Sequence, residues 1–182
     1  MERPDARKRY TQMVLKQSFL TLLKEKPVNK ITVKEVCALA QLNRATFYAH
    51  YSDCFALMEC IENELLAAFE KSLRYVNSFD VTALIEAIYD MVEQNREACR
   101  VLILGNAGST ILMKMIAVAK ENSLAYWRQE LPRASETELQ MMYTHLSNGL
   151  MHVVVDGYDK YSKEEIIHFV TQVVKVSLSL FR

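Results

Sequence analysis

The sequence predicts an all-α protein, and three observations support this prediction. Gly and Pro are scarce, with 4 and 3 among 182 residues, so few positions favour a turn or break a helix. Leu, Met, Ala, Lys and Glu, which favour helices, are abundant. Long segments repeat apolar residues at the spacing of amphipathic helices. The length suits one domain, or two small ones that share a core.

The first predicted helix spans about residues 6–25. Its apolar residues follow i, i+4, i+7 and i+8 spacing: Leu15, Phe19, Leu22 and Leu23. Pro27 and Asn29 end it. The segment Thr32–Glu35 is a capping-box pattern, in which the Thr hydroxyl accepts from a free N–H and the Glu reaches back. It predicts a second, short helix from Val33 to about Ala40.

A tight turn, QLN, follows this second helix. We expect Leu42 to point inward and Asn43 to cap a third short helix. Two short helices joined by three or four residues form a helix-turn-helix pattern.

The remainder predicts longer helices, separated by caps and breaks. Ser52 or Asp53 caps a helix that runs to about Tyr75, and residues 77–80 break it. Further helices are expected over residues 81–95 (capped by Asp80), 96–104 (ended by Gly105), 109–131 (ended by Pro132), from Ser135–Glu138 to Gly157, and from Ser162–Glu165 to Arg182. The total is eight to nine helices, without strands or internal repeats.

The charges are unevenly distributed, although the net charge is zero. Residues 1–52 hold ten Lys and Arg against four acidic residues, a net charge of +6, so residues 53–182 carry −6. A cationic head on an anionic body is expected when only the head approaches phosphates. The alternative is chance clustering of solvated charges. We therefore predict a DNA-binding domain over residues 1–52 and a second helical domain, the body, over residues 53–182.

The cysteine pattern and the hydropathy indicate a soluble, cytoplasmic protein. Four cysteines contain no C-x-x-C pair, which favours free thiols over a disulfide or zinc framework: Cys37, Cys54, Cys60 and Cys99. No apolar segment follows the basic N-terminus as in a signal peptide, and no run of about 18 apolar residues suggests a membrane span. We predict no cofactor, no metal and no membrane partner.

The third helix presents a polar face suited to DNA. Phe47 and Tyr51 lie one turn apart and are expected to face the core. Arg44, Ala45, Tyr48 and Ala49 then point outward, with Thr46 and His50 on the flanks. Arg44 suits a bidentate contact with guanine, and Ala45 permits close approach to the major groove. Thr46, Tyr48 and His50 suit phosphate oxygens, which fix register without reading sequence. Lys34 and the arm from Arg3 to Arg9 would add backbone contacts.

These residues carry a resemblance to a known family. The segment ITVKEVCALAQLNRATFYAHYSDCFAL (residues 31–57) resembles the N-terminal signature of the TetR family of bacterial transcription regulators. The resemblance is specific over about residues 8–60, and elsewhere it rests on helix number and length. It implies a bacterial homodimer on a palindromic double-stranded operator, with a cavity for a small-molecule effector in the body and subunits paired through the last two helices. It also implies base-facing Arg44 and Ala45, phosphate-facing Thr46, Tyr48 and His50, and a DNA contact from Lys34.

One position departs from the family pattern. The family usually has Lys at the start of the fourth helix, where it meets a phosphate, but this chain has Cys54 preceded by Asp53. An acidic residue there favours the helix dipole and repels a phosphate. We expect one phosphate contact to be lost, worth about 1 kcal/mol. Whether this loss abolishes autonomous DNA binding is left open by the sequence, and Arg7 and its basic neighbours could compensate.

The body offers candidate ligand-binding residues between positions 81 and 130. Met and aromatic side chains adapt to irregular cavities, so we single out Tyr89, Cys99, Met113, Tyr126 and Trp127. The alternative for each is ordinary core packing, and no charged group stands out as a selector for a ligand.

The last two predicted helices carry wide apolar stripes, which favour a subunit interface. The candidate interface residues are Met142, Leu146, Leu150, Val153, Phe169, Val173 and Val176. His145, His152 and Asp156 share one side of a helix, but polar contacts at the interface or in the cavity are favoured over a metal site.

A DNA-binding regulator, most simply a repressor released by a ligand, is the function favoured by these observations. The second hypothesis is a co-regulator of the same fold that acts through a protein partner, supported by the missing Lys and the neutral total charge. An enzyme or carrier is the third, but no catalytic constellation or phosphate loop is recognisable, so we do not predict an enzyme. The effector, the operator, and repression versus activation are not determined by the sequence.

Overall fold

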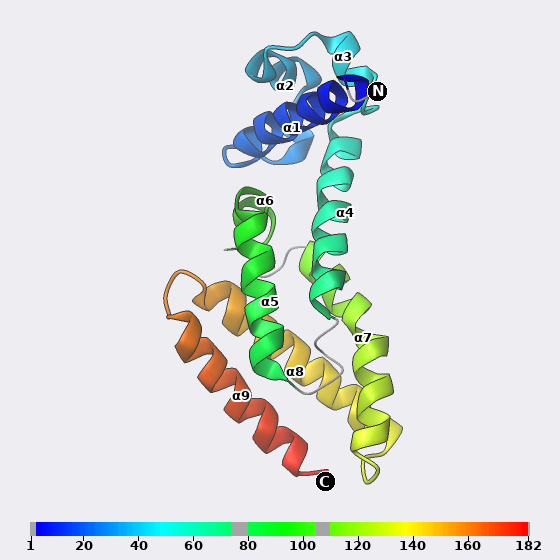
Figure 1. Ribbon diagram of the computed structural model, residues 1–182, viewed down its shortest axis with the longest axis vertical. Helices are drawn as coiled ribbons and strands as arrows, with labels where there is room; N and C mark the ends of the chain where they lie inside the picture. The colour runs from blue at the N-terminus through cyan, green and yellow to red at the C-terminus, as the bar shows by residue number, and fades with distance from the viewer. Residues whose placement is uncertain (1–2, 74–79, 105–109, 182) are drawn as a thin grey trace. The chain divides into compact units, whose positions relative to one another are not determined.

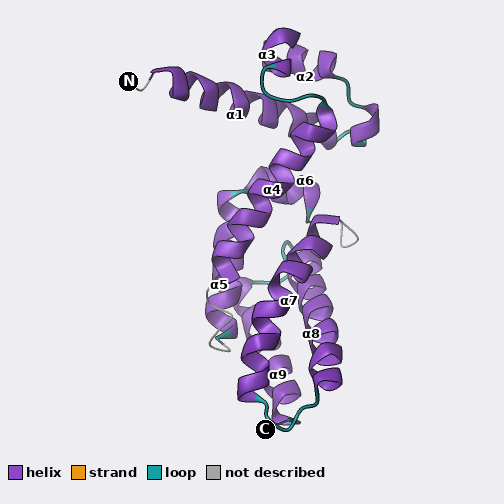
Figure 2. Ribbon diagram, turned by 90° about the vertical axis from the view of Figure 1, so that its right-hand side faces the viewer, coloured by secondary structure: helices purple, strands orange, loops and turns teal. Residues whose placement is uncertain are grey.

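The computed structural model describes residues 3–73, 80–104 and 110–181, and within these ranges all regular structure is helical (Figures 1 and 2). The elements are α1 (Arg3–Leu23), η1 (Val28–Lys30, a 3-10 turn), α2 (Val33–Ala40), α3 (Arg44–Tyr48), α4 (Cys54–Ser72), α5 (Val81–Gln94), α6 (Arg96–Leu102), α7 (Thr110–Glu130), α8 (Glu136–Gly157) and α9 (Lys163–Ser179). The prediction of an all-α fold with eight to nine helices is confirmed, with nine α-helices among the described residues.

Side-chain caps fix where many of these helices begin. Thr32, Ser135 and Ser162 each accept a hydrogen bond from the backbone N–H three residues on, and the Glu carboxylate at that position accepts a hydrogen bond from the N–H of the cap residue. Asn43 and Asp80 cap α3 and α5 by the first of these bonds alone. All five caps are those that the sequence predicted.

Several predicted boundaries lie outside the described residues. They are the end of the fourth helix near Tyr75, the break over residues 77–79, the end of the sixth helix at Gly105 and the end of the last helix at Arg182. Among the described residues, no helix is long and apolar enough to cross a membrane.

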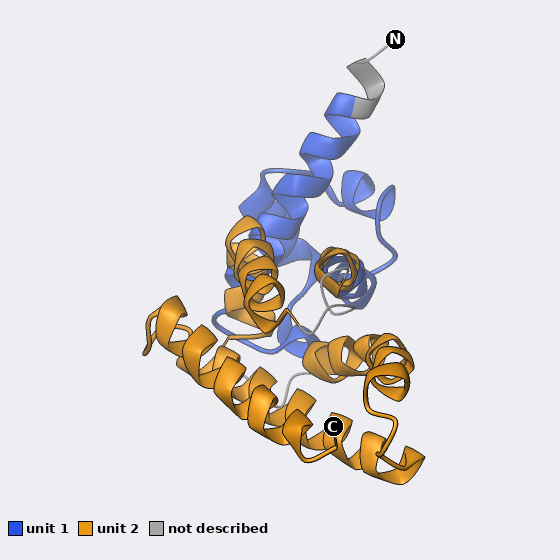
Figure 3. Cartoon of the chain, turned by 60° about the horizontal axis from the view of Figure 1, so that its bottom comes forward, with its two compact units in different colours: residues 1–64 blue, residues 65–182 orange. Residues whose placement is uncertain are grey.

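The chain forms two compact units, residues 1–64 and residues 65–182, called the head and the body below (Figure 3). The division falls inside α4, because the first turns of that helix belong to the head core through the buried Cys54, Leu57 and Ile61. Lys16 of α1 also forms an ion pair with Glu64 of α4. The functional boundary at residue 52 lies before α4 and remains a prediction.

Side chains from four helices make the head core. Leu15 and Phe19 of α1, Val36 of α2, Phe47 of α3 and Leu57 of α4 are all completely buried. In α1, Leu20 is also buried, whereas Leu22 and Leu23, predicted on the apolar face, are half-buried near the helix end. The packing of α1 on α2 and of α2 on α3 holds the helix-turn-helix in one arrangement.

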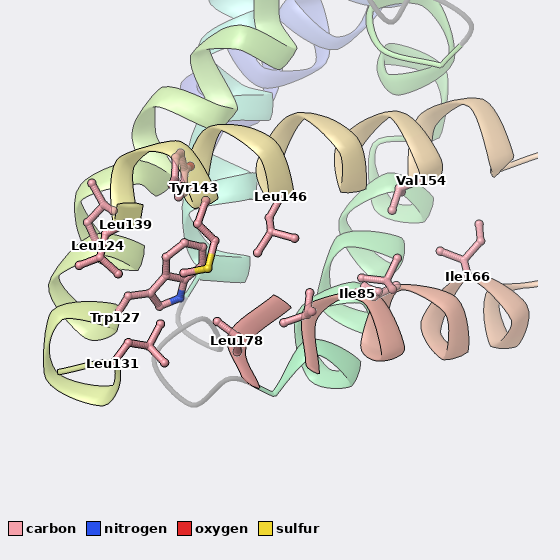
Figure 4. Close-up of a cluster of buried hydrophobic side chains, with 13 residues drawn as sticks. Ile85, Leu124, Trp127, Leu131, Leu139, Tyr143, Leu146, Val154, Ile166 and Leu178 are labelled. Carbon is pink, nitrogen blue, oxygen red and sulfur yellow. The ribbon is translucent and has the colours of Figure 1, made fainter. Parts of the chain in front are cut away.

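The body core lies between α5, α7, α8 and α9, where α8 packs on α7 and α9 and α5 packs on α9. Figure 4 shows its side chains: Leu124, Trp127 and Leu131 lie beside α7 at the left, and Leu146, Val154 and Ile166 lie between α8 and α9. The buried members are Ile85, Leu124, Trp127, Leu131, Leu139, Met142, Tyr143, Leu146, Val154, Ile166, Val170, Val174 and Leu178. This continuous cluster stabilises the body by removing apolar surface from water.

Candidate functional site

A three-residue turn in the head reverses the chain between α2 and α3. Gln41 caps α2 in the left-handed region, with φ 54°, and its N–H donates to Ala38 O while the N–H of Leu42 donates to Cys37 O at 2.9 Å. Asn43 is extended, and its Oδ1 accepts from the N–H of Thr46 at 2.7 Å. This local geometry is the predicted helix-turn-helix.

The second helix of this motif, α3, is short, and buried aromatic side chains anchor it in the head core. Phe47 is completely buried and Tyr51 is buried, with ring centroids 5.9 Å apart. The helix ends at Tyr48, and the N–H groups of His50 and Tyr51 both donate to Phe47 O at 2.9 Å. The inward orientation predicted for Phe47 and Tyr51 is confirmed, although Tyr51 lies beyond the helix, after the turn at Ala49 and His50.

Three residues of α3 face outward, as the sequence predicted. Arg44, Ala45 and Tyr48 are exposed, the last at 57%. Lys34 of α2 is exposed too, and neither Lys34 nor Arg44 takes part in a salt bridge with another described residue. Two cationic side chains and an exposed phenol are thus available to a partner.

The two flanking residues are more constrained. The hydroxyl of Thr46 donates to Asn43 Oδ1 at 2.9 Å, so it must leave this bond before it can donate to a phosphate. His50 is half-buried, and its Nδ1 is buried without a hydrogen-bond partner among the described residues. Nε2 is therefore the nitrogen of His50 suited to a phosphate contact.

The start of α4 explains what Asp53 and Cys54 do. Asp53 Oδ1 accepts from the N–H of Ala56 at 2.8 Å and so caps the helix. Cys54 is buried, 5% exposed, and burial followed by the Asp53 charge raises the pKa of its thiol. A neutral thiol in the head core supplies no charge to a phosphate. The neighbouring Phe55 is 58% exposed and is equally uncharged.

An ion pair supports the beginning of α2. Lys26 Nζ lies 2.5 Å from Glu35 Oε1, while Glu35 Oε2 accepts from the N–H and the hydroxyl of Thr32. The hydrogen bond from Lys26, followed by those from Thr32, lowers the pKa of Glu35 to about 2. The helix that carries Lys34 is therefore anchored at its first turn.

A cavity of about 160 Å³ lies within the body. Apolar side chains of α4, α5, α7, α8 and α9, with one just after α4, form most of its lining: Phe69, Leu73, Val81, Leu84, Ile85, Ile88, Ile116, Ala119, Trp127, Leu146, Leu150, Met151, Val154, Val170 and Val174. The polar lining residues are Asp80, Ser123, Tyr143 and Ser147. A concave apolar space with few polar groups is typical of a small-molecule site.

Most polar groups of the cavity already have partners. Asp80 Oδ1 accepts from the N–H of Ala83 at 2.9 Å, Ser123 donates to Ala119 O at 2.9 Å, and Tyr143 donates to Ile116 O. Burial raises the pKa of Tyr143 to about 12, although the neighbouring Ser147 hydroxyl acts to lower that pKa. Ser147 Oγ is itself buried, with no partner in hydrogen-bonding geometry among the described residues.

The cavity includes one of the five ligand candidates chosen from the sequence, Trp127. Cys99 is completely buried, Met113 is 59% exposed, and Tyr126 and Tyr89 are half-buried against the core cluster without lining the cavity. Tyr89 instead stacks on Tyr158. Sequence reasoning missed Ser147, whose only signal is its place one helical turn after Tyr143 on the same face of α8.

The interface candidates divide between the core and the surface. Met142 and Leu146 are buried in this chain's own core, Leu150 lines the cavity, and Val153 and Val173 pack against the core cluster. Phe169 and Val176 are 53% and 63% exposed on α9. Leu180, which belongs to the predicted apolar stripe of the last helix, is 75% exposed, and Met141, which was not predicted, is 61% exposed.

His145, His152 and Asp156 are all exposed on α8. Asn148 O lies 2.7 Å from His152 Nδ1. No group of three or more His, Cys, Asp or Glu among the described residues is arranged to hold a metal ion.

The fold, the exposed face of α3 and the body cavity define a class of protein, namely a helix-turn-helix head joined to a helical body with an apolar cavity. No protein-family model matches the chain. A curated relative, described as an uncharacterized HTH-type transcriptional regulator, YxbF of Bacillus subtilis (strain 168), is 30% identical over 59 residues. The match covers 32% of this chain and only 16% of that protein.

Solved structures resemble the chain along most of its length. The TetR transcriptional regulator from Streptococcus agalactiae 2603V has a TM-score of 0.63 at 19% identity, covering 94% of this chain and 97% of that one. The fatty acid degradation regulator FadR from Bacillus halodurans has a TM-score of 0.64 at 11% sequence identity, and the match covers 92% of this chain and 94% of that one. SmeT in complex with triclosan has a TM-score of 0.56 at 14% sequence identity, and the match covers 94% of this chain and 83% of that one.

These similarities establish the fold. The chain has the all-helical fold of TetR-family regulators, and the predicted resemblance to that family is confirmed in both the head and the body.

Proposed function

We propose that this protein is a DNA-binding transcriptional regulator that acts as a homodimer and is released from a palindromic operator by a small-molecule effector. The observation that carries the proposal is the outward face of α3. Arg44, Ala45 and Tyr48 are exposed there, on a helix capped by Asn43 and backed by the buried Phe47. A short helix with a cationic start and a small second residue fits the major groove.

The contacts divide into those that read bases and those that fix register. Arg44 is suited to the two acceptors of guanine, and Ala45 permits close approach to the groove. Tyr48, His50 through Nε2 and Lys34 are suited to phosphate oxygens. Thr46 joins them once its hydroxyl leaves Asn43. Two such heads, about 34 Å apart in a dimer, would meet successive major grooves of a palindrome.

The exposed face of α9 supports the homodimer. Phe169, Val176 and Leu180 are spaced by seven and four residues and therefore share one face, and each is more than half exposed. On α8, Gly149 has no heavy atom within 4 Å of an ideal Cβ position, so this face allows close approach of another helix. Apolar residues on the last two helices would be covered in a symmetric pair.

The body cavity supports release by an effector. Phe69 and Leu73, at the end of α4 and just after it, line the cavity, while the same helix begins at Cys54 in the head. A ligand that binds one arrangement of α4 more tightly than another would shift the population away from DNA binding. SmeT, a protein of the same fold, is known in complex with the small molecule triclosan.

Selection of fragments from bacterial genomic DNA by the purified protein tests the proposal. Gel-shift titration of the selected operator should then show affinity that falls steeply with salt concentration. Arg44→Ala should cost about 1–3 kcal/mol of binding free energy and relax the preference for guanine at one position. Lys160→Ala, an exposed basic residue of the body, is the matched control and should change little. Equal binding by Arg44→Ala and wild type would remove the base-contact assignment.

A second candidate function is a co-regulator that acts through a protein partner. The uncharged start of α4, where Cys54 is buried and Phe55 is exposed, favours this alternative. Failure to retain any genomic fragment, together with capture of a partner that Phe55→Ala no longer binds, would establish it in place of autonomous DNA binding.

A further inference from the structure

The chemistry of the body cavity restricts the ligand more closely than the fold does. Its walls are built mainly from aliphatic side chains of α5, α7, α8 and α9, including Leu84, Ile116, Leu150 and Val170. Transfer of an ionised group into such surroundings is unfavourable unless a partner charge is present. Among the described residues, the one charged side chain of the lining is that of Asp80, which is exposed to water and caps α5. A carboxylate ligand would also be repelled by Asp80.

The polar atoms of the wall indicate where a ligand's polar group would sit. Ser123 donates to Ala119 O and Tyr143 donates to Ile116 O, so both hydroxyl protons are already engaged. Ser147 Oγ is buried beside the Tyr143 hydroxyl and lowers the pKa of that group, but no described residue meets Ser147 Oγ in hydrogen-bonding geometry. A buried hydroxyl without a partner costs free energy, which a ligand's hydrogen-bonding group would recover. Ser147 is therefore the recognition point on the wall.

The size of the cavity sets the bulk of the ligand. An apolar cavity of about 150 Å³ in another protein accommodates benzene, and this cavity has about 160 Å³. The available space thus suits a single ring with a small substituent. The flat side chain of Trp127 lies in the wall, where an aromatic ring can stack or meet its edge.

From these three observations we infer that the cavity binds a compact, neutral, single-ring molecule with one hydrogen-bonding group, which pairs with the hydroxyl of Ser147. The inference rests on the proposed function in treating the cavity as the effector site, and it adds the chemical class of the effector and the residue that recognises it.

Four compounds of one shape test the inference on the full chain. They are ethylbenzene, 4-ethylphenol, 4-ethylbenzoate and 4-ethylbenzylamine, which differ in the presence of a hydroxyl, a negative charge or a positive charge. Calorimetry measures their affinities, and the emission of Trp127, the single Trp of the chain, reports binding at the cavity itself. We expect the two neutral compounds to bind, and the charged ones to bind at least about tenfold more weakly.

Ser147→Ala separates the hydrogen bond from apolar burial. It should weaken 4-ethylphenol roughly two- to tenfold, the range of a neutral hydrogen bond. Ethylbenzene should bind unchanged or slightly more tightly, because an unpaired hydroxyl has left the wall. Ser177→Ala is the matched control, since Ser177 donates to Val173 O on α9 and does not line the cavity. Ala119→Leu, which fills the cavity, should abolish binding of both neutral compounds.

Three results would overturn the inference. Equal weakening of both neutral compounds by Ser147→Ala removes the hydroxyl assignment. Binding of the benzoate or the benzylamine as tightly as the phenol removes the neutral class. Absence of binding by both neutral compounds to a folded wild type, judged by its thermal transition, removes the single-ring class. Selective binding without any effect on DNA affinity would leave the inference intact and contradict the proposed release mechanism.

Discussion

The head and the body obtain their functional surfaces in different ways. In the head, local chemistry positions each residue, because caps at Thr32 and Asn43 fix two helix starts and Phe47 anchors α3. In the body, the same kind of caps fix helix starts, but the cavity is formed by residues far apart in the chain, such as Phe69 and Val174. A short motif can therefore specify the head surface, whereas the body cavity depends on packing among five helices, α4, α5, α7, α8 and α9.

The largest expected effect is from Phe47→Ala. Loss of a completely buried aromatic side chain should cost about 3–5 kcal/mol of the free energy of unfolding of the head. DNA binding should be lost, while the Trp127 response to 4-ethylphenol persists, because the cavity is lined by body residues alone. Gel shift and fluorescence measure the two outcomes. Phe55→Ala, at an exposed Phe, is the control, and a simultaneous loss of both activities would contradict the separation of head and body.

The next effect concerns the exposed face of α9. Phe169→Glu places a charge in the proposed subunit interface and should weaken dimerisation by about 2 kcal/mol or more, as for an interface hot spot. Sedimentation over a concentration series measures this change. Met113→Glu, at an equally exposed position of α7, should leave the oligomeric state unchanged. A monomeric wild type, or a dimer insensitive to Phe169→Glu, would contradict the interface.

Cys54→Lys tests the departure at the start of α4. The added ammonium can reach past the helix start to a phosphate, so operator affinity should rise by about 1 kcal/mol. The slope of log affinity against log salt should steepen by about one unit per added contact. Gel shifts at several salt concentrations give both values. Because Cys54 is buried, a thermal transition must accompany them, and Cys54→Ser provides the uncharged control.

Gln41→Gly should stabilise the head slightly. Gln41 has φ 54°, a left-handed conformation that costs a residue with a side chain up to about 1 kcal/mol. Glycine adopts it freely, and the strain that is relieved slightly exceeds the cost of glycine's larger unfolded-state entropy. Denaturant titration measures the gain, and Gln41→Ala should show none. Destabilisation by Gly would mean that the Gln41 side chain makes a contact worth more than the strain.

The smallest expected effect is on the loss of stability at low pH, for which one carboxylate in the head and one in the body can be compared. Glu35 in the head and Glu136 in the body each have a pKa lowered to about 2, the first chiefly by Lys26 and the second chiefly by Arg128. Since the unfolded pKa is about 4.5, each contributes stability above that pH, which is lost as the pH falls toward 2.

Glu35→Gln should therefore make the free energy of unfolding of the head depend less on pH in the acid range. Glu136→Gln should do the same for the body. Circular dichroism and Trp127 fluorescence as functions of pH measure the two pH dependences. Both carboxylates are solvent-exposed, so added salt should reduce each effect. A pH dependence unchanged by either substitution would contradict the assignment.

Much of the head was predictable because its signals are local. The capping box at Thr32, the Asn43 cap and the inward pair Phe47 and Tyr51 all depend on residues within a few positions of one another. The sequence did not reveal that the Thr46 hydroxyl donates a hydrogen bond to Asn43 Oδ1, or that Cys54 is buried. Both facts depend on which neighbour a side chain reaches after the helices have packed.

In the body, helix starts were predictable but helix faces were not. The caps at Ser135 and Ser162 are local, and they lie where the sequence placed them. In contrast, α8 is apolar on more than one side, so periodicity alone could not tell whether Met142 faces a partner or its own core. Of five ligand candidates, Trp127 lines the cavity, and Ser147 was not foreseen.

The sequence by itself determined the helical class, the helix starts, the polar face of α3 and the family resemblance. These properties follow from hydrogen bonds and side-chain periodicity within one or two turns of a helix. The tertiary structure decided which apolar faces meet, where packing leaves a cavity, and which hydroxyl in that cavity has no hydrogen-bond partner in the described part of the chain. Such outcomes depend on contacts between residues distant in the chain, for which a single sequence carries no local signal.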